Sequence, residues 1–212
     1  MRSIPNNTKD LIYLISKVGF SPIRGLLVWL FMSKGSGLPF VGQGVKIISA
    51  RMITCGKLVW IGQYCYIDAQ SEVGIKLGSG VTLREGGTIQ CRSGLNTPGA
   101  GLSIGENTFI GPNFKIGVGG FIAIGKNCQF GSHCSINAES HVVGSDGTYT
   151  SGKTQRKGVV IGDDVWVGDG VIFLDGIQVG SNSIIGAGSV VNKDVDSGTV
   201  VAGIPAKYLR KL

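Results

Sequence analysis

Hydrophobic residues recur at every sixth position along most of this chain. Each is aliphatic or aromatic, and most are followed by glycine. The repeat positions are Ile61, Ile67, Val73, Leu77, Leu83, Ile89, Ile104, Ile110, Ile116, Ile124, Phe130, Ile136, Ile161, Val167, Phe173, Val179, Ile185 and Val191. Neither the 3.6-residue period of a helix nor the alternation of a half-buried strand explains a period of six. A short repeat of this kind predicts a solenoid in which short β segments stack coil on coil.

A second position keeps the same period four residues later, where small or β-branched residues recur. We expect this residue to point inward near a corner, while the larger residue fills the middle of the coil. Three repeats would then close one triangular coil, and successive coils would stack at the parallel-strand spacing of about 4.8 Å. The sequence therefore predicts an all-β, parallel β-helix. Cys65, Cys128 and Cys134 fall on the small position, so we interpret them as core residues of a protein in a reducing compartment.

The residues before the repeat follow a different pattern. Residues 9–32 carry two apolar segments, each too short to span a bilayer, which needs about 20 residues. The segment lacks the arrangement of a secretory signal peptide. We expect a helical cap over residues 1–40 that covers the first coil, with an interfacial helix on a membrane as the alternative. The β-helix is expected over 41–200, with an inserted loop at about 142–158, and a tail over 201–212.

Three phrases near the end of the chain are more specific than the repeat. They are IGDDVWVG at 161–168, IGAGSVVNKDV at 185–195 and VAGIPAK at 201–207. In this order they resemble the left-handed β-helix (hexapeptide-repeat) acyltransferases. The resemblance is to the branch of galactoside, maltose and nodulation-factor acetyltransferases and of O-acetyltransferases for bacterial surface polysaccharides. It implies a left-handed helix, acetyl-CoA as acyl donor, and a homotrimer whose coenzyme A groove lies between subunits.

Only two histidines are present, His133 and His141. Catalytic zinc sites commonly use three protein ligands, and the carbonic anhydrases of this fold use three histidines, so we expect no metal. His141 precedes the break in the repeat, and the resemblance assigns the catalytic histidine here. A neutral imidazole can accept the proton of an attacking hydroxyl, so we interpret His141 as the general base, with Glu139, Asp146 or a backbone carbonyl as its orienting acceptor. We expect His133 to face outward on a flat side, in a structural or subunit-contact role.

The remaining candidate residues come from motif matching. The resemblance implies contacts with coenzyme A and, for one asparagine, with the acceptor. The coenzyme A candidates are Asp169, Ala187, Asn192, Lys193, Lys207 and Arg210, and the acceptor candidate is Asn113. Lysine and arginine donors suit the phosphates of coenzyme A. Asp169 departs from the small hydroxyl residue common at its position, and Trp166 could either shape the groove or pack.

The net charge of +7 is compatible with nucleic acid, a membrane surface or a phosphorylated small molecule as partner. No continuous basic tract with interleaved aromatic residues occurs, which argues against nucleic acid. We therefore expect a cytoplasmic enzyme that acetylates a saccharide hydroxyl of a capsule or lipopolysaccharide, with the inner face of the membrane as the alternative location. The alternatives are an N-acetyltransferase acting on an amino-sugar, whose relatives carry a larger N-terminal domain, and a non-catalytic β-helix scaffold.

Overall fold

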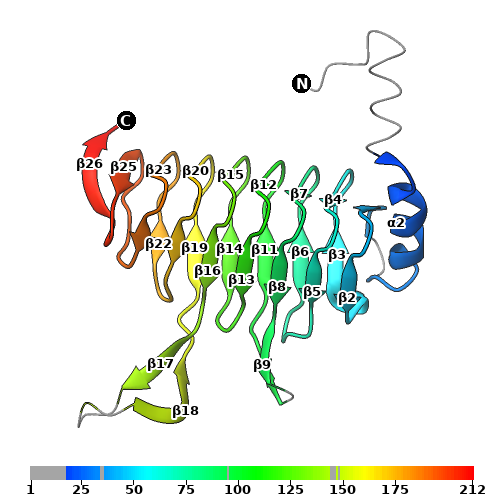
Figure 1. Cartoon of the computed structure of the whole chain (residues 1–212), viewed down its shortest axis with the longest axis horizontal. Helices are drawn as coiled ribbons and strands as arrows, with labels where there is room; N and C mark the ends of the chain where they lie inside the picture. The colour runs from blue at the N-terminus through cyan, green and yellow to red at the C-terminus, as the bar shows by residue number, and fades with distance from the viewer. Residues whose placement is uncertain (1–17, 34–35, 95, 144–146, 148) are drawn as a thin grey trace.

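The protein is a three-sided prism of stacked parallel strands, with a helix at one end and a short antiparallel strand at the other (Figure 1). The computed structural model describes residues 18–33, 36–94, 96–143, 147 and 149–212. Each side of the prism is one sheet, and each turn of the chain adds one strand to every sheet. This confirms the predicted parallel β-helix.

The first sheet has nine strands, of which the last is antiparallel. They are β1 (Phe40–Val41), β4 (Trp60–Ile61), β7 (Thr82–Leu83), β12 (Phe109–Ile110), β15 (Gln129–Phe130), β20 (Trp166–Val167), β23 (Ile184–Ile185), β25 (Thr199–Ala202) and β26 (Lys207–Lys211).

The second sheet has seven strands. They are β2 (Lys46–Ile48), β5 (Tyr66–Asp68), β8 (Thr88–Gln90), β13 (Lys115–Gly117), β16 (Ser135–Asn137), β21 (Ile172–Phe173) and β24 (Val190–Val191). The third sheet has six strands. They are β3 (Ile53–Cys55), β6 (Ile75–Leu77), β11 (Leu102–Ile104), β14 (Ile122–Ile124), β19 (Val159–Ile161) and β22 (Gln178–Val179).

Two antiparallel hairpins leave the corner between the second and third sheets. One is formed by β9 (Arg92–Gly94) and β10 (Thr97–Pro98), and the other by β17 (Ser140–Val143) and β18 (Tyr149–Gln155). Both project from the same edge of the prism in Figure 1. The sequence predicted an irregular loop at about 142–158, whereas the structure forms a hairpin that begins at Ser140.

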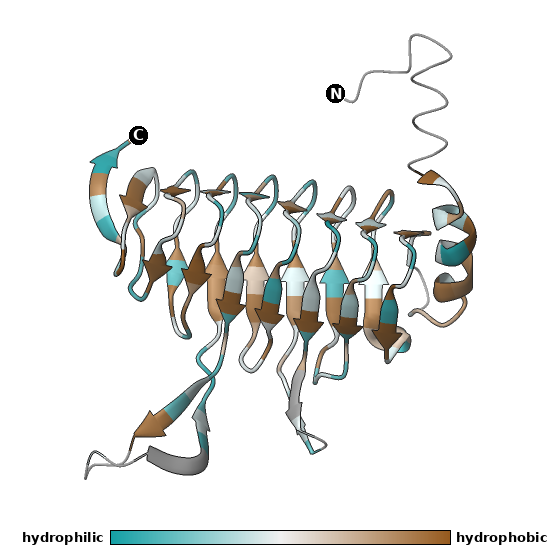
Figure 2. Ribbon diagram, in the orientation of Figure 1, coloured by the Kyte–Doolittle hydropathy of each residue, from teal (hydrophilic) through white to brown (hydrophobic). Residues whose placement is uncertain are grey.

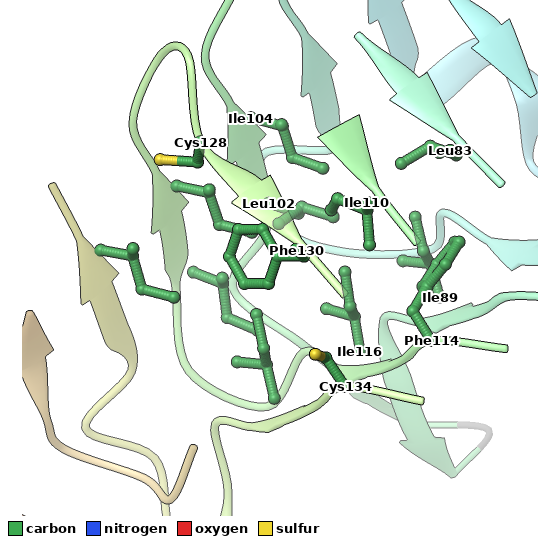
Figure 3. Packing of buried hydrophobic residues seen from close by; sticks show 14 of the residues in the cluster. Leu83, Ile89, Leu102, Ile104, Ile110, Phe114, Ile116, Cys128, Phe130 and Cys134 are labelled. Carbon is green, nitrogen blue, oxygen red and sulfur yellow. The ribbon is translucent and has the colours of Figure 1, made fainter. Parts of the chain in front are cut away.

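The core is a single column of buried side chains along the axis of the prism. Strand register aligns equivalent residues of successive coils, so that Ile110 pairs with Leu83 on one side and with Phe130 on the other. Figure 3 shows these side chains within the space that the three sheets enclose. Phe130 and Phe173 pack edge to face with their ring centroids 6.2 Å apart. Burial of this column supplies the hydrophobic stabilisation that a thin cross-section needs.

Small residues occupy the inward position near the corner as predicted, and the fold also accommodates a large residue there. Cys65, Cys128 and Cys134 are buried, which confirms their placement in the core. Phe114 occupies an equivalent place, although it is large. It fits because the neighbouring residue is Gly87, where a Cβ atom would overlap the phenyl ring.

The sequence placed Val73 in the core, and this was wrong. Val73 is 71% exposed, and Ile75 and Leu77 fill the coil instead. Val73 lies in the corner before β6, where Gly74 adopts a φ of +82°. Val73 therefore belongs to the turn, and β6 starts at Ile75, later than the six-residue period predicts.

The N-terminal end is covered by α2 (Ser21–Trp29), followed by the chain that leads into β1. A short 3-10 helix, η1 (Ala50–Met52), lies in the first coil. Val28 and Met32 pack against the core from this end. Among the described residues, no helix has the length and apolar character needed to cross a membrane. The first predicted apolar segment, up to residue 17, lies outside the described residues.

Candidate active site

His141 lies on β17, the first strand of the longer hairpin. It is opposite Thr154 of β18, and its side chain is exposed. The antiparallel ladder pairs Ser140 with Gln155 and His141 with Thr154 outside the prism, and its register shifts between His141 and Val143. His141 is therefore presented on a projecting ribbon rather than on a flat side of the helix.

Charged side chains anchor the base of this hairpin. Arg156 Nε lies 2.6 Å from Glu139 Oε2, and the two side chains are only 28% and 23% exposed. The same guanidinium donates from Nη1 to the carbonyl oxygen of Pro98 at 3.0 Å. Arg156, which follows β18, thus connects the end of that strand to Glu139, just before β17, and to Pro98 of the β9–β10 hairpin. The carboxylate of Glu139, one predicted orienting acceptor of His141, is engaged by Arg156; Asp146 lies outside the described residues.

Asp175, one coil further on, also anchors the base of the hairpin that carries His141. Its Oδ1 accepts a hydrogen bond from the backbone N–H of Gly158 at 2.8 Å, and its Oδ2 accepts one from that of Lys157 at 3.2 Å. Ser140 Oγ donates to Oδ2 at 3.5 Å. Sequence reasoning missed both Arg156 and Asp175. The charge of Arg156 at the end of the interruption was the available signal for that residue, whereas Asp175 lies one coil later and had no such signal.

A second group of candidate residues lies along the corner between the first and second sheets. Asn113 and His133 occupy equivalent corner positions of successive coils, each with a φ of +58°. Asn113 Nδ2 lies 3.3 Å from His133 Nε2. His133 is exposed, as predicted, but it does not lie on a flat side, because the turn between β15 and β16 takes this residue into the left-handed region at a corner. Asparagine tolerates that conformation better than most residues, which accounts for Asn113 there.

Asp169 and Ala187 continue this corner in the next two coils. Asp169 Oδ1 accepts a hydrogen bond from the backbone N–H of Ser132 at 2.6 Å, and the backbone of Gly188 donates to the carbonyl oxygen of Asp169 at 2.8 Å. One oxygen of the Asp169 carboxylate therefore joins two coils. The place where Gly168 would carry a Cβ atom is filled by Ala187.

The C-terminal candidates surround a cavity of about 330 Å³ at the end of the prism. Asn192, Lys193 and Lys207 all line it, together with the carboxylate residues Asp194 and Asp196. One oxygen of Asp194 accepts a hydrogen bond from the backbone N–H of Gln178 at 2.8 Å.

Arg210 lies on β26, opposite Val200, and is exposed. The tail predicted over 201–212 thus contains β26, which folds back on β25. Trp166 is 60% exposed on β20, so it is not part of the core. The exposed cations at the C-terminal end of the prism can donate hydrogen bonds to phosphate groups.

The fold does not bring all these residues together within one chain. Asn113, His133, Asp169 and Ala187 share one corner, whereas the hairpin that carries His141 leaves another. The C-terminal cations lie at the end of the prism. Within the described part of the chain, no group of three histidine, cysteine, aspartate or glutamate side chains is placed to hold a metal ion.

The environment of the five buried cysteines disfavours ionisation of their thiols. Burial raises the pKa of the Cys55 thiol to about 11. It raises that of Cys91 to about 12, with a further contribution from the nearby Asp68 carboxylate. Burial also raises the pKa values of Cys65, Cys128 and Cys134. A thiol must ionise to act as a nucleophile, so none of the five is poised to carry an acyl group.

Comparison with known proteins agrees with this architecture. Residues 158–193 match the bacterial transferase hexapeptide (six repeats) family. No curated protein matches the sequence.

Three solved structures illustrate the structural similarity. A hexapeptide-repeat acetyltransferase from Vibrio cholerae, in complex with acetyl coenzyme A, is 23% identical with a TM-score of 0.53, covering 99% of this chain and 93% of that one. A maltose O-acetyltransferase from Clostridium difficile is 20% identical with a TM-score of 0.51, covering 100% and 79%. A mutant of the N-acyltransferase AntD from Bacillus cereus, in complex with dTDP and coenzyme A, is 16% identical with a TM-score of 0.56, covering 85% and 90%.

These findings, together with the three parallel sheets, establish the fold. The chain is a left-handed parallel β-helix of the kind found in hexapeptide-repeat acetyltransferases, and its residues 158–193 carry the bacterial transferase hexapeptide repeat.

Proposed function

We propose that this protein transfers the acetyl group of acetyl-CoA to a hydroxyl group of a saccharide, with His141 as general base. The observation that carries the proposal is the exposed position of His141 on a projecting hairpin whose base is fixed by Arg156 and Asp175. A general base needs a defined position and access to its substrate, and an exposed histidine on a hairpin that is anchored at its base supports this role.

The chemistry requires one proton acceptor and no covalent acyl-enzyme. The neutral imidazole of His141 takes the proton of the saccharide hydroxyl as the oxygen attacks the thioester carbonyl carbon. Collapse of the tetrahedral intermediate breaks the carbon–sulfur bond, and the coenzyme A thiolate recovers the proton from the imidazolium. Direct transfer is favoured because the five thiols are buried and have raised pKa values.

Two further features support coenzyme A as the donor. Lys193 and Lys207 line the cavity at the C-terminal end, with Arg210 on the neighbouring strand β26. These cations would hold the phosphates, while the corner of Asp169 and Ala187 would run beside the pantetheine arm. The cations do not share a corner with His141 in one chain, which supports a homotrimer in which the hairpin of one subunit faces the corner of its neighbour.

We also propose that the acceptor is part of a bacterial capsule or lipopolysaccharide. The apolar N-terminal segment, which resembles that group of enzymes more than the galactoside enzymes, supports this choice.

The donor site is tested by calorimetric titration with acetyl-CoA. We expect saturable binding that is lost in a variant with Lys193, Lys207 and Arg210 all replaced by alanine. The matched control replaces three exposed lysines away from the C-terminal end and should retain binding; they are Lys76 on β6, Lys115 on β13 and Lys126 in the turn before β15. Absence of binding by the unaltered protein at millimolar ligand would leave the scaffold alternative standing.

The catalytic role is tested by coenzyme A release in a screen of saccharide and amino-sugar acceptors. His141→Ala should lower turnover by about 10²–10⁴-fold, the range for loss of a general base. His133→Asn is the control variant, because asparagine also tolerates the left-handed conformation at this corner, and it should keep the turnover of the unaltered protein. Unchanged turnover in His141→Ala would refute the assignment. An alkali-stable amide product from an amino-sugar, in place of a labile ester, would instead identify an N-acetyltransferase.

A further inference from the structure

The helix at the N-terminal end exposes its large apolar residues and buries its small ones. Ser21 and Gly25 are buried against the prism, and Val28 and Met32 continue this face one and two turns later. The exposed large apolar side chains of α2 and of the residues next to its ends are Phe20, Ile23, Leu26, Leu27, Trp29, Leu30 and Phe31. Figure 2 shows α2 as a largely hydrophobic element at the end of the prism. A helix that served only as a cap would place these residues toward the core.

The orientation of α2 is fixed by contacts that allow no larger residue at the interface. A Cβ atom on Gly25 would overlap the carbonyl oxygen of Pro39. Arg24 Nε donates to the carbonyl oxygen of Val41 at 2.9 Å, and Trp29 Nε1 donates to that of Ser36 at 2.9 Å. These hydrogen bonds hold the helix with its small residues inward. Within the described part of the chain, the apolar face therefore points away from the prism.

The apolar surface continues from the helix onto the first coil. Leu27 is 58% exposed and Phe31 is 71% exposed. Together with Val28, Val45, Ile47 and Ala50 they line a recess of about 480 Å³. Contiguous exposed apolar surface of this kind marks sites of protein or membrane interaction.

The positive charge of the chain is concentrated in the stretch of sequence that includes α2 and the first coil. Residues 11–67 contain six lysine and arginine residues and no aspartate or glutamate, so this stretch carries six of the seven net positive charges. The cations in this stretch are Lys17, Arg24, Lys34, Lys46, Arg51 and Lys57. Of the described ones, Lys46, Arg51 and Lys57 are exposed on the first coil.

We propose that this end of the prism, formed by α2 and the first coil, binds the surface of an anionic lipid bilayer. The apolar face of α2 would enter the interface between headgroups and acyl chains, while the exposed cations contact the anionic headgroups. A second copy of this chain fits less well, because two such ends would bring like charges together. Of the segment 9–32 for which the sequence predicts membrane contact, the structure describes residues 18–32. The inference is independent of acetyl transfer.

Vesicle flotation of the full chain tests the proposal. We expect binding to vesicles of phosphatidylcholine with phosphatidylglycerol, and much weaker binding to phosphatidylcholine alone. The double variant Arg51→Gln/Lys57→Gln should bind the anionic vesicles roughly 30-fold less well, at about 1 kcal/mol for each cation near the surface. The double variant Leu27→Gln/Phe31→Gln should lose at least about tenfold because it removes two apolar side chains from the interface.

Matched controls separate these effects from general loss of charge or apolar area. Lys115→Gln/Lys126→Gln removes two exposed lysines, one on β13 and one in the turn before β15, and Val73→Gln removes an exposed apolar side chain from a corner. Both should bind as the unaltered protein does. All variants change exposed residues, so unchanged melting temperatures should verify that they are folded.

Two outcomes would overturn the proposal. One is equal or absent binding to both vesicle types. The other is concentration-dependent self-association in sedimentation velocity that Leu27→Gln/Phe31→Gln abolishes without vesicle binding by the unaltered protein, which would identify a second copy as the partner.

Discussion

Replacement of Arg156 by alanine should loosen the hairpin that carries His141 while the prism remains intact. Arg156 contributes an ion pair to Glu139 and a hydrogen bond to the carbonyl oxygen of Pro98. Both contacts lie at the base of β17 and β18. An isolated two-stranded hairpin has little stability of its own, so this one depends on the contacts at its base.

The size of the effect follows from the burial of the pair. A hydrogen bond to a charged group contributes about 1.5–3 kcal/mol. The two side chains are 28% and 23% exposed, which favours the lower part of that range. We therefore expect the free energy of opening the hairpin to fall by about 2 kcal/mol, and its opening constant to rise about 30-fold.

Hydrogen exchange measured by mass spectrometry provides the assay. Peptides that cover β17 and β18 should exchange about 30-fold faster in Arg156→Ala, whereas those from the core strands should keep their rates. Lys126→Ala is the matched control. Lys126 forms a 3.8 Å ion pair with Asp163 in which the side chains are 58% and 45% exposed, and exposed pairs contribute little.

A double-mutant cycle with Glu139→Gln isolates the ion pair from other effects of truncation. The two changes should be non-additive, because either one removes the same contact. Hairpin exchange rates in Arg156→Ala equal to those of the unaltered protein would refute the reasoning. A rise of the same size in Lys126→Ala would do so as well, since it would show a non-specific effect of losing a cation.

Two further predictions concern the core. Phe173→Ala should lower the free energy of unfolding by about 3–5 kcal/mol in a denaturant titration, because Phe173 is fully buried and packs against Phe130; a loss below 1 kcal/mol would contradict this packing. The five thiols should resist Ellman's reagent at pH 8 in the folded protein and react when it is unfolded. Burial raises the pKa values of these thiols above the ordinary 9.0, to about 11 for Cys55 and about 12 for Cys91. The protonated thiols therefore contribute to the stability of the fold below pH 9, and this contribution is lost as the pH rises toward the folded pKa values. A free energy of unfolding that increases above pH 9 would exclude this.

Much of the candidate site could be anticipated from residue types and the position of the break in the repeat. His141 was placed at the root of the excursion because the six-residue pattern stops there, and it lies on the hairpin that the structure forms. The candidates Asp169, Ala187, Asn192, Lys193, Lys207 and Arg210 rested on motif resemblance. Their distribution over one corner and one end of the prism, away from His141, was not apparent from the motifs.

The sequence by itself determined the β-helix and its core. Successive coils need an apolar residue that points inward and a small residue near the corner. The local spacing of these residues therefore specifies the buried column, including Cys65, Cys128 and Cys134. The spacing fails where a turn takes up a different number of residues, as at Val73. It also fails at His133, whose corner position depends on the backbone conformation of the turn.

Only the tertiary structure decided which faces and charged groups meet. Arg156 is 17 positions from Glu139 and 58 positions from Pro98 in the sequence. No local pattern could therefore show that these residues join two hairpins. The outward apolar face of α2 was equally hidden, because an amphipathic pattern does not say which side faces the protein. Close packing of Gly25 against Pro39 made that choice, since small residues let the backbones approach and leave the large side chains outside.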